Sequence, residues 1–126
     1  APPIVFATAG ERSIGRVRFG AAYEGPPGCV HGGVLALAFD QVLNVANLMA
    51  GAVGPTKRLA LTFRKPTPLH TDLVFEGWVE QRSEREVCSR GRLLRGDVVT
   101  VEAEGVFALL SAERVLRMLG PTADGR

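Results

Sequence analysis

The feature that most constrains the fold is an apolar stretch, residues 34–50, which polar side chains interrupt at helical spacing. Asp40, Asn44 and Asn47 recur at intervals of four and three residues, and almost all the other side chains are Ala, Val, Leu, Phe or Met. At about 100° per residue the three fall within about 60° of one another on a helix, and the rest of the circumference is apolar. The stretch therefore predicts a helix that other structure covers, with a single polar stripe.

The chain enters this helix through a glycine-rich turn, His31-Gly32-Gly33. Glycine leaves the backbone N–H groups of the first turn unobstructed, at the end of the helix where its dipole favours negative charge. The turn fits an ordinary helix entry and equally a site for an oxyanion. His31 also allows two interpretations: its ring bonds to the backbone, or it orients the turn and donates to a substrate.

Asp40 is the one carboxylate within this apolar stretch. The positions three and four residues away on either side carry no lysine or arginine, since they are Ala36, Leu37, Leu43 and Asn44. A neutralising partner must come from elsewhere in the structure, or the carboxylate is poised to act as a base toward water. Asp40 is therefore either a structural hydrogen-bonding group or a catalytic residue.

Short alternating segments on both sides of the helix predict strands. One precedes the helix, over residues 13–23, and four follow it, over residues 58–64, 72–81, 85–94 and 98–110. Strands joined by such short links favour an antiparallel sheet, and a helix that is apolar almost all round needs that sheet to curl about it. The fold class is therefore α+β, with an antiparallel sheet around one long central helix.

Glycine and proline mark the boundaries of these elements. Gly51 and Gly54-Pro55 predict the end of the helix, because Gly suits a left-handed cap and Pro cannot continue a helix. Residues 1–12 receive no assigned element, since residues 4–8 fit either a short strand or a helical turn. A short helix is expected over residues 111–119. Three strand glycines are expected where strands bend or where the helix comes close, at Gly77, Gly91 and Gly105.

Length and charge exclude several classes of protein. At 126 residues the chain is expected to be one domain, residues 1–126, with a disordered tail at about 120–126. The formal net charge is only +2 and the basic residues are dispersed, so we expect no nucleic-acid surface. The apolar helix is at the lower limit of membrane-span length and its polar stripe disfavours lipid, so no membrane span is expected.

The cysteines and histidines are too few and too scattered to suggest a metal site or a disulfide framework. Cys29 and Cys88 form no CxxC pair, and a reducing, cytoplasmic setting is the one that this pattern favours. We therefore expect neither a metal nor another cofactor.

Residues 24–33, Glu-Gly-Pro-Pro-Gly-Cys-Val-His-Gly-Gly, followed by Asp40, resemble the HGG…D signature of hotdog-fold acyl-CoA thioesterases of the phenylacetic-acid-degradation (PaaI-type) branch. Residues 56–69 are similar to the strand that follows the helix in that family and ends in Arg/Lys-Pro-x-Pro-Leu. The match spans roughly residues 15–110. The resemblance implies the hotdog fold and hydrolysis of an acyl-CoA to a free acid and CoA, in a homodimer or a tetramer of dimers.

The resemblance also implies roles for single residues. Asp40 would be the catalytic carboxylate, either as general base or as nucleophile. Gly32 would supply the N–H that binds the developing oxyanion, and Thr56 would position the water or the carboxylate. Some members carry an asparagine where this chain has Gly25, so polarisation of the carbonyl would depend more on the backbone donor and on His31.

Four further residues are candidates for binding the substrate: Gly33 and Asn44 near the reacting group, and Arg58 and Arg64 for the phosphates of CoA. The aliphatic surroundings favour a fatty or aryl acyl group. Two alternatives are a hotdog enoyl-CoA hydratase or dehydratase, and a non-catalytic acyl-CoA sensor, although a sensor would leave the His-Gly-Gly turn and the aspartate unexplained.

Helical geometry adds a prediction about assembly. Gly32 and Asp40 are eight residues apart, which places them about 12 Å apart along the helix axis and about 80° apart around it. One chain is therefore not expected to bring both groups to one carbonyl. The site is expected to form between two subunits, with Gly32 from one and Asp40 from the other.

Overall fold

The computed structural model describes residues 4–111, 113, 114, 116, 117 and 119 of the chain. In this part the chain forms six strands, a 3-10 turn and one long helix. In chain order they are β1 (Val5–Ala9), β2 (Arg12–Val17), the 3-10 turn Ala21–Tyr23, α1 (Gly32–Met49), β3 (Thr56–Phe63), β4 (Leu73–Arg82), β5 (Glu86–Arg95) and β6 (Val98–Ala108).

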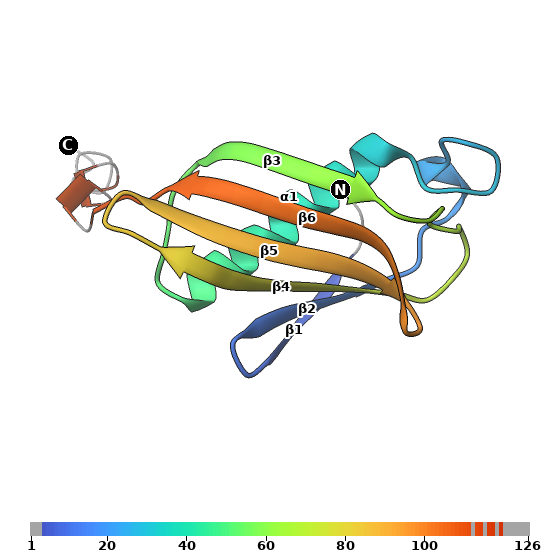
Figure 1. Cartoon of the computed structure of the whole chain (residues 1–126), viewed down its shortest axis with the longest axis horizontal. Helices are drawn as coiled ribbons and strands as arrows, with labels where there is room; N and C mark the ends of the chain where they lie inside the picture. Colours follow the sequence, from blue (N-terminus) through green and yellow to red (C-terminus); the bar gives the residue numbers. More distant parts are fainter. Residues whose placement is uncertain (1–3, 112, 115, 118, 120–126) are drawn as a thin grey trace.

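The six strands form one antiparallel sheet in the order β1-β2-β4-β5-β6-β3. Figure 1 shows α1 lying against one face of this sheet and crossing the strands obliquely. β1 and β3 are the two edges of the described sheet. The predicted class, an antiparallel sheet around one long helix, is confirmed, and so are the helix boundaries, with Gly51 at a φ of 69° after the last turn.

A row of small residues lets the helix lie close to the sheet. Neighbouring strands pair these residues side by side, as Ser13, Gly77, Gly91 and Ala103. A Cβ atom on Gly77 would lie 2.9 Å from Val42 Cγ1 of the helix, and a Cβ atom on Gly91 would lie 3.1 Å from Leu43 Cδ2. The expectation that the strand glycines mark a close approach of the helix is therefore confirmed.

Adding a side chain to this row should destabilise the fold. We expect Gly91→Val to lower the free energy of unfolding by about 2–3 kcal/mol, because its Cβ alone would lie 2.9 Å from the backbone oxygen of Glu76. The matched control is Gly20→Val, since Gly20 has an extended backbone and a Cβ atom added there would meet nothing within 4 Å. The free energy of unfolding of both variants is measured by urea denaturation, with circular dichroism as the signal. Equal midpoints for the two variants would contradict the close-packing explanation.

The central helix is covered on one face only. Its buried residues are Leu35, Ala38, Phe39, Val42, Leu43, Ala46 and Asn47. Leu37 and Leu48, in contrast, are 53% and 68% exposed. The helix is long and apolar enough to cross a bilayer, with a mean hydropathy of 1.3, but it packs on the sheet as a core helix and is not a membrane span. Within one chain, only the side of the helix that faces the sheet is covered. The expectation that other structure covers the apolar surface of the helix is therefore met on that side alone.

At the N-terminal side one predicted boundary was wrong and one strand had not been assigned. The strand predicted over residues 13–23 ends at Val17, and the alternation beyond it comes from Phe19 and Tyr23, whose rings pack edge to face 5.4 Å apart from a loop and the 3-10 turn. β1 forms where no element was assigned, because its five side chains are all exposed and show no alternation. The described chain therefore has five strands besides β1, as predicted, and six in all.

The C-terminal predictions can be compared only in part. The described residues of the segment 111–119 that follow Ser111, namely 113, 114, 116, 117 and 119, are helical, as predicted. The predicted tail at 120–126 lies outside the described residues.

Candidate active site

The start of α1 presents two backbone N–H groups with different surroundings. His31 is the N-cap, with an extended backbone at φ −62° and ψ 135°, and its ring Nδ1 accepts a hydrogen bond of 2.9 Å from the Gly33 N–H. Within the described chain, the N–H of Gly32 donates to no acceptor. The structure therefore shows the capping interpretation of His31, and it leaves Gly32, not Gly33, with an N–H that can receive an oxyanion.

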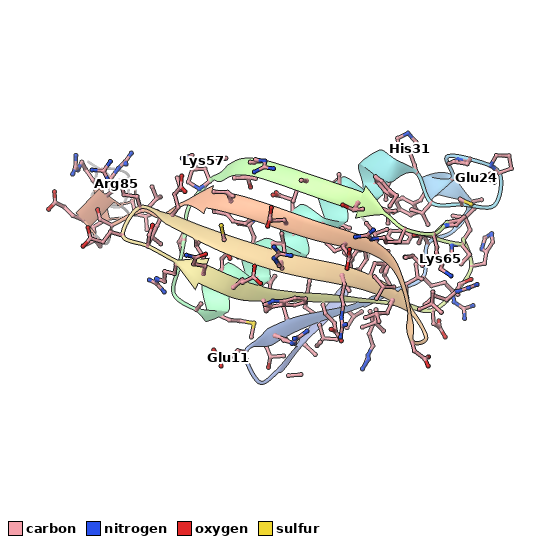
Figure 2. The ribbon with its side chains drawn as sticks, viewed as in Figure 1. Glu11, Glu24, His31, Lys57, Lys65 and Arg85 are labelled. Atoms are coloured by element: carbon pink, nitrogen blue, oxygen red, sulfur yellow. The ribbon has the colours of Figure 1, made fainter. Side chains whose placement is uncertain are left out.

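The loop before the helix explains why an asparagine is missing at position 25. A Cβ atom on Gly25 would lie 2.8 Å from the Cα of His31, so a larger residue would displace the N-cap. The loop is closed by Glu24, whose carboxylate accepts a 2.7 Å bond from the Gly28 N–H. Figure 2 shows Glu24 and His31 at the same end of the molecule.

A groove of about 470 Å³ opens beside Gly32. Its walls are largely apolar and include Leu35 and Phe63, whose ring would lie 3.5 Å from a Cβ atom on Gly32. Two basic residues, Arg64 and Lys65, complete the lining. Arg64 is paired with Glu102 at 2.7 Å, whereas Lys65 makes no ion pair with a described residue. The groove therefore combines a free backbone donor, apolar walls and a positive charge.

The carboxylate of Asp40 lies further along the helix and contacts Thr56 at the start of β3. The Thr56 hydroxyl donates a 2.7 Å hydrogen bond to Asp40 Oδ1. Asn44, one turn later, donates through Nδ2 to the backbone oxygen of Asp40 and not to its carboxylate. Asp40 is half-buried, and none of the described lysines or arginines pairs with it. The structure thus brings together two of the predicted residues, Asp40 and Thr56, in an acid–hydroxyl pair.

The free N–H and the carboxylate do not meet within one chain. Gly32 and Asp40 both belong to α1, so eight residues of helix hold them about 12 Å apart along the axis. In Figure 2, His31 lies at one end of the molecule and Lys57, next to Thr56, lies toward the other. The two halves of the predicted site are therefore separate in the single chain.

Arg58 is the remaining predicted residue. It lies on the edge strand β3, is exposed, and takes part in no described ion pair. The structure places it on the same strand as Thr56, two residues further on.

Sequence reasoning missed Phe63, which lines the groove beside Gly32, and the pair that Asn47 forms with Ser89 on β5. The position of Phe63 at the end of an alternating strand, directly before Arg64 and Lys65, was a usable signal, because an exposed aromatic residue beside basic residues is a candidate for contact with a ligand or another chain. Ser89 gave no such signal, since nothing in the sequence connects it with a residue 42 positions away.

The described chain forms an antiparallel sheet around one helix. This helix starts with an N–H that has no acceptor and carries a carboxylate further along. These features define a hotdog-fold protein. The chain belongs to the Thioesterase superfamily, since the family model of that description matches residues 27–102. The family assignment made from the His-Gly-Gly turn and Asp40 is thereby confirmed.

Individual relatives agree with this assignment. The mouse (Mus musculus) protein acyl-coenzyme A thioesterase THEM4 is 28% identical over 108 residues, which are 84% of this chain and 46% of that protein. The crystal structure of protein RHA08564, a thioesterase superfamily protein, has a TM-score of 0.82 and 38% identity, over 85% of this chain and 56% of that one. This chain thus spans about half the length of these relatives.

A third structure is similar in fold. A mutant of the phenylacetic acid degradation protein PaaI from Thermus thermophilus has a TM-score of 0.77 at 15% identity, over 85% of this chain and 93% of that one. At this identity the likeness shows the hotdog fold alone.

Proposed function

We propose that this chain is an acyl-CoA thioesterase that hydrolyses a fatty or aryl acyl-CoA to the free acid and CoA. The observation that carries the proposal is the Asp40 carboxylate, which is bonded by the Thr56 hydroxyl and by no described cation, on the central helix of a Thioesterase superfamily fold. A carboxylate that no cation neutralises remains available to take a proton or to attack a carbonyl. The mouse relative, named an acyl-coenzyme A thioesterase, supports the substrate class.

In the proposed mechanism Gly32 and Asp40 act on the same thioester from different sides. The Gly32 N–H stabilises the carbonyl oxygen as it becomes negative. Asp40 removes a proton from water, whose oxygen attacks the carbonyl carbon, or the carboxylate attacks directly and forms an anhydride that water then cleaves. In either route the carbon–sulfur bond breaks and CoA leaves as the thiol. Thr56 holds the carboxylate in position through its hydroxyl.

We further propose that two copies of the chain form the active site, in a homodimer or in a tetramer made of two such dimers. β3 is an eight-residue edge strand, and the unpaired backbone groups of such an edge can pair with another chain. Phe63 at its end is 57% exposed and Leu37 on the helix is 53% exposed, so a partner would cover apolar surface. A second chain would also supply the group that lies about 12 Å away in the first.

For the CoA phosphates we propose the basic residues at the rim of the Gly32 groove and along β3. Lys65 lines the groove with a charge that no described carboxylate neutralises, and Arg58 is likewise unpaired among the described residues. Arg64 lines the same groove, but it would have to share its guanidinium with Glu102. The cytoplasmic setting expected from the two cysteines, both of which are free thiols, stays a prediction.

A thiol-release screen tests the proposed reaction. Short, medium, long-chain and aryl CoA esters are each mixed with the purified chain, and the free thiol is measured together with the absorbance of enoyl-CoA substrates. We expect thiol release without change in the enoyl absorbance. Enoyl hydration without thiol release would instead identify a hydratase. Tight binding of an acyl-CoA without either signal would identify a sensor.

Thr56→Ala should reduce the turnover number by roughly tenfold, because water can partly replace a positioning hydroxyl. The matched control is Thr62→Ala on the same strand, an exposed threonine for which no bond to the carboxylate is present. Steady-state rates at saturating substrate measure both variants. An unchanged rate for Thr56→Ala would show that the threonine is structural only.

A further inference from the structure

A second, more apolar groove begins one helical turn beyond the carboxylate. It has a volume of about 590 Å³, within the range typical of small-molecule sites. Asn44 and Asn47 of the helix contribute to its lining. Its apolar walls are formed by Leu48, Ala52, Val53, Gly54, Pro55 and Leu110, and one charged residue, Arg114, also lines it.

The groove comes next to the acid–hydroxyl pair at two points, although neither Asp40 nor Thr56 lines it. Pro55 in its wall directly precedes Thr56, and Asn44 in its lining bonds to the backbone of Asp40. A thioester whose carbonyl lies at Asp40 can therefore extend its acyl chain along the helix into this groove. The groove beside Gly32, in contrast, carries the basic residues that suit the CoA end.

The floor of the groove holds one polar group without a partner among the described residues. Asn47 is only 2% exposed, and the Ser89 hydroxyl donates to its Oδ1. Its Nδ2 is buried and bonds to no described atom. A buried amide donor left unsatisfied is costly, so a ligand that offers an acceptor oxygen there would gain binding energy that a plain hydrocarbon would not.

Helix geometry gives the depth of this donor. Asn47 follows Asp40 by seven residues, so it lies about 10 Å further along the axis and within about 20° of the same side. Because a carbon–carbon bond is about 1.5 Å long, a zigzag chain of about eight carbons spans that distance.

We propose that this groove holds the acyl group of the substrate, and that Asn47 Nδ2 selects medium-length acyl groups with an acceptor oxygen near their far end. This inference rests on the proposed thioesterase function and names its substrate class. Asn47 acts here as a specificity-determining residue and has no part in the chemical step.

The test compares two CoA esters of equal length: octanoyl-CoA and its analogue with a ketone on the penultimate carbon. For the unaltered chain we expect kcat/KM to be at least about fivefold higher for the keto ester. In Asn47→Leu this ratio should fall to about one or below, because the donor is gone and the floor is apolar. The double variant Asn47→Leu/Ser89→Ala repeats the measurement without leaving the buried Ser89 hydroxyl unpaired.

A second pair of variants locates the acyl group. Val53 is 45% exposed in the groove wall, and Val53→Trp should lower the ratio of octanoyl-CoA to acetyl-CoA kcat/KM by about tenfold by filling the groove. The matched control is Val5→Trp, on the exposed edge strand β1, which should leave that ratio unchanged.

The outcomes separate the two proposals. Hydrolysis of both octanoyl esters at equal kcat/KM by the unaltered chain would overturn the role of Asn47 and leave the thioesterase function intact. An octanoyl-to-acetyl ratio that Val53→Trp does not change would overturn the placement of the acyl group. Hydrolysis of no CoA ester at all would overturn the proposed function together with this inference.

Discussion

Asp40→Asn is expected to reduce the turnover number for acyl-CoA hydrolysis by roughly a hundredfold or more. The amide keeps the size of the side chain and can still bond to Thr56, but it can neither accept a proton from water nor attack a carbonyl. Binding of CoA should change by only a few-fold, because the residues proposed to bind its phosphates lie elsewhere. Steady-state kinetics with the best ester of the thiol-release screen, and a binding titration with CoA, measure the two quantities.

The matched control for this variant is Asp97→Asn. Asp97 is exposed in the tight turn between β5 and β6, where asparagine is equally suited. It should hydrolyse the ester at the unaltered rate. If Asp40→Asn turned over as fast as Asp97→Asn, Asp40 would have no part in the chemistry, and its bond with Thr56 would be structural.

Mixing two inactive variants is expected to restore about a quarter of the unaltered activity, if Gly32 and Asp40 come from different subunits. One chain carries Asp40→Asn and the other Gly32→Pro. With random pairing half the dimers are mixed, and each mixed dimer holds one doubly altered site and one intact site. Thiol release of the co-expressed mixture is compared with that of each variant alone. Two different affinity tags then isolate the mixed dimers, which should show about half of the unaltered activity because each keeps one intact site of two.

The structure shows that Gly32→Pro is a suitable choice. Gly32 is the first residue of α1, where proline is favoured and where its missing N–H breaks no helical bond. His31 before it has the extended backbone that a following proline requires, and a Cβ atom at Gly32 meets only the Phe63 ring, at an ordinary 3.5 Å. Gly32→Ala, which keeps the N–H, is the control and should stay active. Folded mixed dimers without recovered hydrolysis would show that both groups act within one chain.

The parts of the fold that depend on the spacing of apolar residues and on glycines that end elements could be predicted from the sequence. The polar stripe and Gly51 indicated the helix and its end, and the alternation after the helix indicated β3 to β6. β1 could not be found, because all five of its side chains are exposed and a strand with no buried face has no alternating pattern. Phe19 misled the strand prediction, since it is fully buried from a loop.

Only those parts of the candidate site that depend on residues adjacent in the sequence could be predicted. The start of the helix at Gly32 could be derived from the glycine-rich turn. The contact between Asp40 and Thr56 was implied by the family resemblance alone, because the loop between α1 and β3 decides which residue of the strand faces the carboxylate. The direction of the Asn47 side chain, toward Ser89 on β5, depends on how the helix docks on the sheet, and no sequence pattern encodes that.

The order of elements along the chain has a consequence during synthesis on the ribosome. α1 is complete at Met49, but β4, β5 and β6, which cover it, are complete only at Ala108. At about 5–20 residues per second, the most apolar segment of the protein therefore leaves the ribosome several seconds before its sheet exists. During this interval the nascent helix offers a long hydrophobic surface, which makes it the segment that a ribosome-associated chaperone would bind first.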